Sequence, residues 1–222
     1  MNAMPYHSYI FFDSDINFAL LPVKKQQECK KKFIATVNKK NRFVKVESYA
    51  TLGLKAGTRF MLYCNAASPD HIQDFIRDCT HTELGIYLRI TYTLLGMTRA
   101  SPYNPKSVPK ESSPDVAHRY LIVYPFTKTI EWHLLPYEER RRIMKDHVNV
   151  GRKFTASISQ LLLYSYGIDD HEFIVSYQTD ILEDFQTLVM ELRGTEGRRH
   201  TKNDLPIFTC IHRPLSKTLD ML

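Results

Sequence analysis

The chain has 222 residues, of which 43% are apolar and 24% are charged, and its formal net charge is +6. This balance is typical of a globular protein with a sizeable core and excludes a disordered or fibrous chain. The sequence contains no apolar run of about 18 residues and no signal-peptide pattern at its start, so we expect a cytoplasmic protein without a membrane span.

The basic residues and the cysteines restrict the kinds of ligand that the chain is expected to bind. Lysine and arginine gather in three separate runs, at residues 24–32, 139–142 and 198–202. Separate runs are only weak evidence for a nucleic-acid partner, and they are just as compatible with a polyanionic small ligand. We expect no nucleic-acid partner. The four cysteines form no CxxC pair and have no spacing suited to zinc, so we expect reduced thiols.

The first half of the chain predicts the element order β-α-β-β-α-β. Alternating or β-branched runs indicate strands, apolar residues at helical spacing indicate helices, and Ser68 followed by Pro69 is typical of a helix start. The elements are expected at residues 8–14 (strand), 21–40 (helix), 44–54 and 58–66 (hairpin), 68–79 (helix) and 84–96 (strand).

The same order returns after a segment that contains four prolines and no apolar period. This segment, residues 100–117, is expected to be a linker or an active-site loop. Asp180 is the expected N-cap of the last helix, and Gly194 its end. The later elements are expected at residues 119–128 (strand), 136–154 (helix), 157–166 and 171–180 (hairpin), 180–194 (helix) and 205–211 (strand).

Two β-α-β-β-α-β halves predict an α+β fold made by tandem duplication of ferredoxin-like units, of the dimeric α+β barrel type. The expected divisions are residues 1–99 for the N-terminal half, 100–117 for the connecting segment, and 118–222 for the C-terminal half, which is expected to carry the functional site. Sequence identity between the halves is slight, so the repeat is inferred from the order of elements.

Three polar or ionisable residues of the second half occupy positions where the pattern expects hydrophobic ones. Tyr124 shares one face of its strand with Lys128 because side chains alternate along a strand. Gln160 interrupts an apolar row of the following hairpin, and His147 lies on the apolar stripe of its helix. Together they indicate a functional site within one β-α-β unit.

Each of these residues also has a structural explanation when taken singly. Tyr124 would be a core tyrosine with its hydroxyl at the rim, and Gln160 an amide bonded to backbone. His147 would be a core histidine with a hydrogen-bond partner. Lys128 would be a solvated strand end, and Trp132 a packing residue.

Two stretches carry a resemblance to a known family. They read YPFTKTIEWHLLPYEERRRIMKDHVNVGRK and YSYGIDDHEFIVSYQTDILEDFQTLVMELRGTEGRR. Their combination of YPxxK, a tryptophan just before a helix, ERR…DH…GRK on that helix and GIDD…ELRxTE resembles the chlorite-dismutase-like haem proteins, which include the coproheme decarboxylases. The specific likeness covers residues 118–211, while the first half agrees only in its order of elements.

The resemblance implies a bound iron porphyrin, either haem b or coproheme, in the C-terminal half. His147 matches the histidine that ligates the iron, and a neutral imidazole can do so through one nitrogen. Glu196 matches a carboxylate that orients the other nitrogen, although it could equally be a solvated acid after a helix. Trp132 matches a residue of the cofactor pocket.

The resemblance also implies an activity. Gln160 stands where chlorite-decomposing members have an arginine, and a neutral amide there resembles the coproheme decarboxylases. Tyr124 matches the tyrosine that those enzymes oxidise, and Lys128 matches a lysine beside the reacting propionate. We therefore expect a decarboxylase that converts iron coproporphyrin III to haem b with hydrogen peroxide, assembled as a homopentamer.

Two other functions remain open at this point. A haem-binding protein with weak peroxidase activity or a haem-transfer role would use the same pocket, with Tyr124 and Lys128 only lining it. A basic nucleic-acid-binding module is the more remote alternative, and it would show a steep salt dependence of binding.

Overall fold

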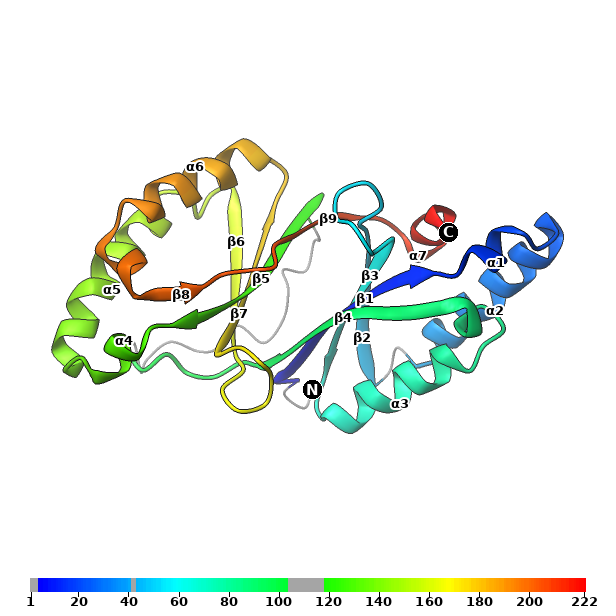
Figure 1. Ribbon diagram of the computed structural model, residues 1–222, viewed down its shortest axis with the longest axis horizontal. Helices are drawn as coiled ribbons and strands as arrows, with labels where there is room; N and C mark the ends of the chain where they lie inside the picture. Colours follow the sequence, from blue (N-terminus) through cyan, green and yellow to red (C-terminus); the bar gives the residue numbers. More distant parts are fainter. Residues whose placement is uncertain (1–3, 41–42, 104–117) are drawn as a thin grey trace. The chain divides into compact units, whose positions relative to one another are not determined.

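The computed structural model describes residues 4–40, 43–103 and 118–222 and divides the chain into two compact units (Figure 1). Unit 1 comprises the chain up to Thr98 together with Phe208–Leu222, and unit 2 comprises Arg99–Ile207. Most of the proline-rich segment lies outside the described residues, so its role as a linker or active-site loop stays a prediction. Among the described residues, no helix is both long and apolar enough to cross a membrane.

Unit 1 is an antiparallel sheet with its two long helices on one face (Figure 1). Its elements are β1 (Tyr6–Ser14), α1 (Ile16–Ala19), α2 (Val23–Lys40), β2 (Val44–Ala50), β3 (Phe60–Ala66), α3 (Pro69–Thr80), η1 (Gly85–Tyr87), β4 (Leu88–Met97), β9 (Phe208–His212), α7 (Leu215–Thr218) and η3 (Leu219–Met221). The strand order is β4-β1-β3-β2-β9. Phe33 of α2 and Phe75 of α3 are buried in one core cluster with Phe60 of β3.

Unit 2 repeats this plan with its own helices over its own sheet. Its elements are β5 (Tyr120–Lys128), α4 (Ile130–Leu134), α5 (Tyr137–Arg152), β6 (Ile158–Tyr164), β7 (Phe173–Thr179), α6 (Leu182–Arg193), η2 (Glu196–His200) and β8 (Thr201–Asn203). The antiparallel strands follow the order β6-β7-β5-β8. A smaller core cluster joins Val175 and Tyr177 of β7 to Leu188 of α6.

The two units share the same strand register, which confirms the predicted duplication. Tyr6 of β1 pairs with Ala66 of β3, and Tyr120 of β5 pairs with Thr179 of β7. In the same way, the first residue of β2 is opposite Ala66, and the first residue of β6 is opposite Thr179. The segments that follow the first strand of each unit read INFALLP and IEWHLLP. Positions can therefore be matched one by one between the units.

The last predicted strand is reassigned by the structure. Residues 205–211 were expected to complete the second half, but β9 pairs with β2 of unit 1, with Tyr49 opposite His212. The physical reason is that β2 offers a free sheet edge, whose amide and carbonyl groups gain partners from an added strand. The short strand β8, beside β5, takes the fourth place in unit 2. The division therefore differs from the expected 118–222, because residues 208–222 belong to unit 1.

Helix starts were predicted with mixed success. The Ser68 side chain caps α3 by accepting a hydrogen bond from the Asp70 amide at 3.2 Å, as expected. The expected cap by Asp180 is wrong, because its carboxylate instead accepts from the Arg119 amide at 2.7 Å and lies 2.9 Å from His118 Nδ1. Asp180 therefore ties the start of β5 to the start of α6.

Candidate functional site

One face of the unit 2 sheet brings the predicted strand residues together. Directly opposed residues of an antiparallel sheet point to the same side. Ile122, Tyr177 and Gln160 are opposed across β5, β7 and β6. Tyr124 lies one step further along the same face, where it is opposite Val175. Tyr124 therefore shares this face with Gln160, and Tyr177 stands between them.

Helices α5 and α6 cover this face with apolar side chains. Val150 belongs to α5, Phe154 follows that helix, and both pack against the cluster that contains Tyr124 and Tyr177. Phe185 and Leu188 supply the wall from α6. The layer between sheet and helices is therefore made mainly of aliphatic and aromatic side chains packed against one another.

Tyr124 is a half-buried phenol on β5. Its ring lies 6.1 Å from that of Tyr177, measured between centroids, with 26° between the ring planes. Burial raises the pKa of Tyr124 because an apolar environment disfavours the phenolate. The side chain is therefore a neutral phenol at physiological pH.

Lys128 and Trp132 form a contact at the end of β5. Lys128 Nζ lies 4.6 Å from the centroid of the Trp132 ring, within the range of a cation–π interaction. Trp132 is 3% exposed and lies in α4, which Thr129 caps. Burial lowers the pKa of Lys128 to about 8, with Glu172 opposing the shift and Arg198 adding to it. Lys128 is therefore a cation that loses its proton near physiological pH.

Glu172 is a site residue that the sequence reasoning missed. Its carboxylate accepts a hydrogen bond from the Lys128 amide at 2.8 Å and lies 2.9 Å from His133 Nε2. It thus fixes the end of β5 from the β6–β7 turn. The only signal in the sequence was an acidic residue at the end of a turn, which is too common a pattern to single out.

His147 lies on α5, half-buried, and faces the backbone of η2. Within the described residues, no hydrogen bond joins either ring nitrogen to another group. A methyl group added at Gly197 would lie 3.8 Å from His147 Nδ1, so the absence of a side chain there leaves space beside the ring. Burial lowers the pKa of His147, and the nearby Lys128 charge lowers it further. The imidazole is therefore neutral, with a lone pair free to bind a metal.

Glu196 lies next to Gly197 in η2, but its carboxylate is engaged elsewhere. Its two oxygens accept hydrogen bonds from Arg142 Nη2 at 2.9 and 2.8 Å, and Arg142 also pairs with Glu139. The predicted role of Glu196 in orienting His147 stays a prediction. Gln160 is exposed at its position opposite Tyr177.

The matched positions of unit 1 are filled by apolar side chains. Phe33 stands where unit 2 has His147, and it is fully buried. Ile10 matches Tyr124, and Phe18 matches Trp132. The remaining matched pairs are Val46 with Gln160, Cys64 with Tyr177, and Leu84 with Gly197. Unit 1 therefore has the fold of unit 2 with the corresponding space filled by its own core.

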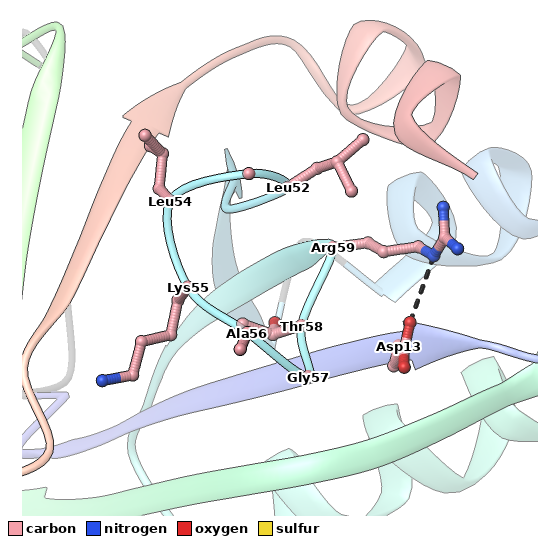
Figure 2. A pocket seen from close by; sticks show the side chains of 9 residues that line it. Asp13, Leu52, Leu54, Lys55, Ala56, Gly57, Thr58 and Arg59 are labelled. Carbon is pink, nitrogen blue, oxygen red and sulfur yellow. Dashed lines mark hydrogen bonds and ion pairs between the residues drawn. The ribbon is translucent and has the colours of Figure 1, made fainter.

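A hollow of about 470 Å³ lies elsewhere, in unit 1 (Figure 2). It is lined by Asp13 and by residues 52–59, the loop between β2 and β3. The Arg59 guanidinium closes one side of it through an ion pair with Asp13 at 3.1 Å, drawn in Figure 2. None of the predicted site residues lies there, so this hollow does not bear on the site expected in unit 2.

The unit 2 site fits an iron porphyrin on chemical grounds. A haem needs an axial ligand, an apolar slot for a flat macrocycle and cations for its carboxylates. His147 supplies a neutral imidazole without an internal hydrogen bond among the described residues, and the α5 and α6 side chains supply the apolar wall. Lys128 supplies a positive charge at the end of β5.

Comparison with known proteins agrees with this assignment. The family model described as chlorite dismutase matches residues 26–213. The coproheme decarboxylase of Mycolicibacterium smegmatis is 29% identical over 162 residues, which cover 72% of this chain and 70% of that protein. The chlorite dismutase of Ideonella dechloratans is 28% identical over 204 residues, which cover 85% and 70%.

The fold of a solved structure matches closely as well. A mutant chlorite dismutase from Candidatus Nitrospira defluvii superposes with a TM-score of 0.90 at 26% identity, covering 99% of this chain and 95% of that one. The match extends over both units, so the duplicated α+β plan is shared as a whole.

Proposed function

The chain belongs to the chlorite dismutase family of haem enzymes, and we propose that this member is a coproheme decarboxylase that uses hydrogen peroxide to make haem b. The observation that carries the proposal is the place of Tyr124. An oxidisable phenol lies on the same sheet face as the neutral amide of Gln160, beneath the helix that carries His147. Chlorite decomposition would favour a fixed cation at the Gln160 position, and none stands there.

The protein residues have distinct roles in this proposal. His147 binds the iron through one ring nitrogen, and Trp132 and the α5 and α6 side chains hold the macrocycle. Lys128 holds the carboxylate of the reacting propionate. When bound, the porphyrin iron supplies the centre at which peroxide is reduced.

Tyr124 carries the oxidation to the propionate. Its hydroxyl loses one electron and one proton to the peroxide-derived oxidant, and the phenoxyl oxygen then removes a hydrogen atom from the propionate β-carbon. The resulting carbon radical gives up a second electron, for which peroxide is again the final acceptor, the bond to the carboxylate breaks, and carbon dioxide departs to leave a vinyl group. Per propionate, one peroxide accepts two electrons and, with one proton from the substrate and one from solvent, becomes two waters.

The test is a turnover experiment with the natural substrate class. The protein is titrated with iron coproporphyrin III, peroxide is added, and the porphyrin products are followed by mass together with released carbon dioxide. Loss of two carboxyl groups with matching carbon dioxide supports the proposal. Porphyrin that is bound but unchanged, or bleached without carbon dioxide, would contradict it.

A haem-binding protein with weak peroxidase activity or a haem-transfer role is the second candidate. The observation in its favour is that both oxygens of the Glu196 carboxylate accept from Arg142, a pairing that would weaken any effect of this acid on the basicity of His147. The same experiment separates the two functions, because only the decarboxylase releases carbon dioxide.

The proposed assembly is a homopentamer, as the family resemblance implies. Light scattering on the purified protein should give about five times the 26.0 kDa chain mass. A monomer mass at the protein concentrations of the turnover experiment would contradict the proposed pentamer but not the proposed reaction.

A further inference from the structure

Four residues at the end of β5 form a closed ring of contacts. Lys128 Nζ lies 4.6 Å from the centroid of the Trp132 ring. The Lys128 amide donates a hydrogen bond to one oxygen of Glu172 at 2.8 Å, and His133 Nε2 lies 2.9 Å from the other oxygen of that carboxylate. His133 follows Trp132 in α4, which closes the ring. The ring therefore joins β5, α4 and the turn between β6 and β7.

The direction of α4 depends on a very short connection. Only Thr129 lies between the end of β5 and the first residue of α4, and its side chain caps the helix by accepting from the Trp132 amide at 3.4 Å. The two backbone dihedrals of Thr129 therefore affect where the Trp132 ring lies relative to Lys128. The Glu172 carboxylate restricts these dihedrals because it bonds to both elements.

We propose that Glu172 and His133 are positioning residues that hold Lys128 against Trp132 before porphyrin binds. The inference rests on the proposed role of Lys128 as the partner of a porphyrin carboxylate. We call the Glu172–His133 pair, with its bond to the Lys128 amide, the clamp. Because the clamp already orders the cation, binding of the carboxylate does not have to do so, and the entropy cost of binding is smaller.

The clamp is itself anchored to the turn. The Glu172 carbonyl accepts a hydrogen bond from the Ser165 amide at 2.8 Å, and the His133 ring meets that of Tyr166 edge to face at 6.2 Å between centroids. The Glu172 side chain is 20% exposed, so its bond to His133 is less weakened by solvent than that of a surface pair. The carboxylate also favours the charged form of Lys128, since burial lowers the pKa of that amine and Glu172 opposes the shift.

Unit 1 shows that the fold does not require the clamp. At the matched positions, Arg59 stands where unit 2 has Glu172, and Ala19 stands where it has His133. Alanine has no polar group in its side chain, and the Arg59 guanidinium pairs with Asp13 at 3.1 Å instead. The same strand and short helix of unit 1 are therefore joined without a carboxylate–imidazole pair. This difference relates the clamp to the site of unit 2 rather than to the architecture.

The first test uses the haem-free protein, in which Trp132 is the sole tryptophan. Its ring is buried, so acrylamide should quench its fluorescence poorly in the wild type. In Glu172→Ala and in His133→Ala, α4 is released from β5 and the quenching constant should rise at least roughly twofold. Asp170→Ala is the control, because it removes an exposed carboxylate from the same turn, and it should leave the constant unchanged. Wild-type quenching in both clamp variants would overturn the inference.

The second test measures affinity for two porphyrins without turnover. Glu172→Ala should bind iron coproporphyrin III roughly threefold to tenfold more weakly than the wild type, which is the cost of ordering one long side chain. It should bind the tetramethyl ester of the same porphyrin, in which the carboxylates are masked, as the wild type does. Equal losses for both porphyrins would contradict the inference, because Glu172 would then shape the pocket rather than position the cation.

A double-mutant cycle tests whether the clamp acts through Lys128. In the Lys128→Met background, Glu172→Ala should cause no further loss of affinity for iron coproporphyrin III, because no cation is left to position. Additive losses would contradict the inference. If Glu172→Ala does not fold, His133→Ala removes the partly exposed ring of α4 instead and serves in the same comparisons. A wild type that binds the porphyrin without decarboxylating it would defeat the proposed function alone, since neither quenching nor affinity depends on turnover.

Discussion

The ammonium group of Lys128 lies over the ring of Trp132, with 4.6 Å between Nζ and the ring centroid. The contact joins the last residue of β5 to the short helix α4 and holds a cation in a largely buried place. Because burial lowers the pKa of Lys128 to about 8, its charge is sensitive to pH in the range where the protein would work.

The first prediction is an alkaline loss of decarboxylation that depends on Lys128. The rate should fall by half near pH 8, because the neutral amine no longer holds the propionate carboxylate. In Lys128→Arg the charge persists at high pH, so the remaining activity should extend above pH 9. Rates are measured from pH 6 to 10 at equal porphyrin occupancy. The same midpoint in both proteins would mean that another group controls the profile.

The same shift in pKa has a consequence for stability. The folded protein binds the Lys128 proton less tightly than the unfolded chain, so between about pH 8 and the ordinary lysine value near 10.4 the unfolded chain holds more protons. The cost of the buried charge is present in full below pH 8 and is relieved as the pH rises. Lys128→Met should therefore be more stable than the wild type at pH 7, with a difference that shrinks toward pH 10 in urea unfolding.

The next prediction concerns the iron ligand. His147→Gly should retain the fold but lose the wild-type Soret band with coproheme, since the position lies on the helix face that meets Gly197. Added imidazole should restore part of the band by occupying the vacated space. His118→Gly is the control, because His118 precedes β5 and pairs with Asp180 just before α6. An unchanged spectrum in His147→Gly would remove His147 as the ligand.

A further prediction uses the space at Gly197. An added methyl group there would meet its nearest neighbours at 3.7 to 3.8 Å, which is ordinary contact, so Gly197→Ala should bind porphyrin nearly as the wild type does. Gly197→Leu copies Leu84 of unit 1 and should fill the space beside His147. We expect its porphyrin affinity to fall at least about tenfold with little change in thermal unfolding. Equal affinities of the two variants would show that this space is not used.

The last prediction tests the redox role of Tyr124 directly. Tyr124→Phe keeps the ring and its packing against Tyr177, so porphyrin binding should be unchanged and stability should fall by about 1 kcal/mol. Vinyl formation should fall by orders of magnitude, because phenylalanine cannot form a phenoxyl radical. Both proteins are compared at matched Soret absorbance. A wild-type rate in the mutant would take Tyr124 out of the mechanism.

Much of the site could be found from local sequence pattern. His147 stood out because it interrupts an apolar helical stripe, and Tyr124 and Lys128 because a period of two puts them on one strand face. Tyr177 obeys the same period, with Phe173 and Val175, yet it was missed because a single tyrosine in an apolar strand is usually core. Its place in the candidate site becomes apparent only from the strand register, which sets it between Gln160 and Tyr124.

The sequence by itself determined the fold class and the duplicated order of elements, and it predicted that unit 2 carries the site. These follow from the period, branching and polarity of neighbouring residues, which act over a few positions of the chain. Only the tertiary structure decided that β9 joins β2, that Arg142 holds Glu196, and that unit 1 has filled its matching space with Phe33 and Leu84. Those outcomes depend on which groups, distant in the sequence, pair with a free strand edge, pair with a carboxylate or fill a space in the core. A local sequence pattern does not specify these partners.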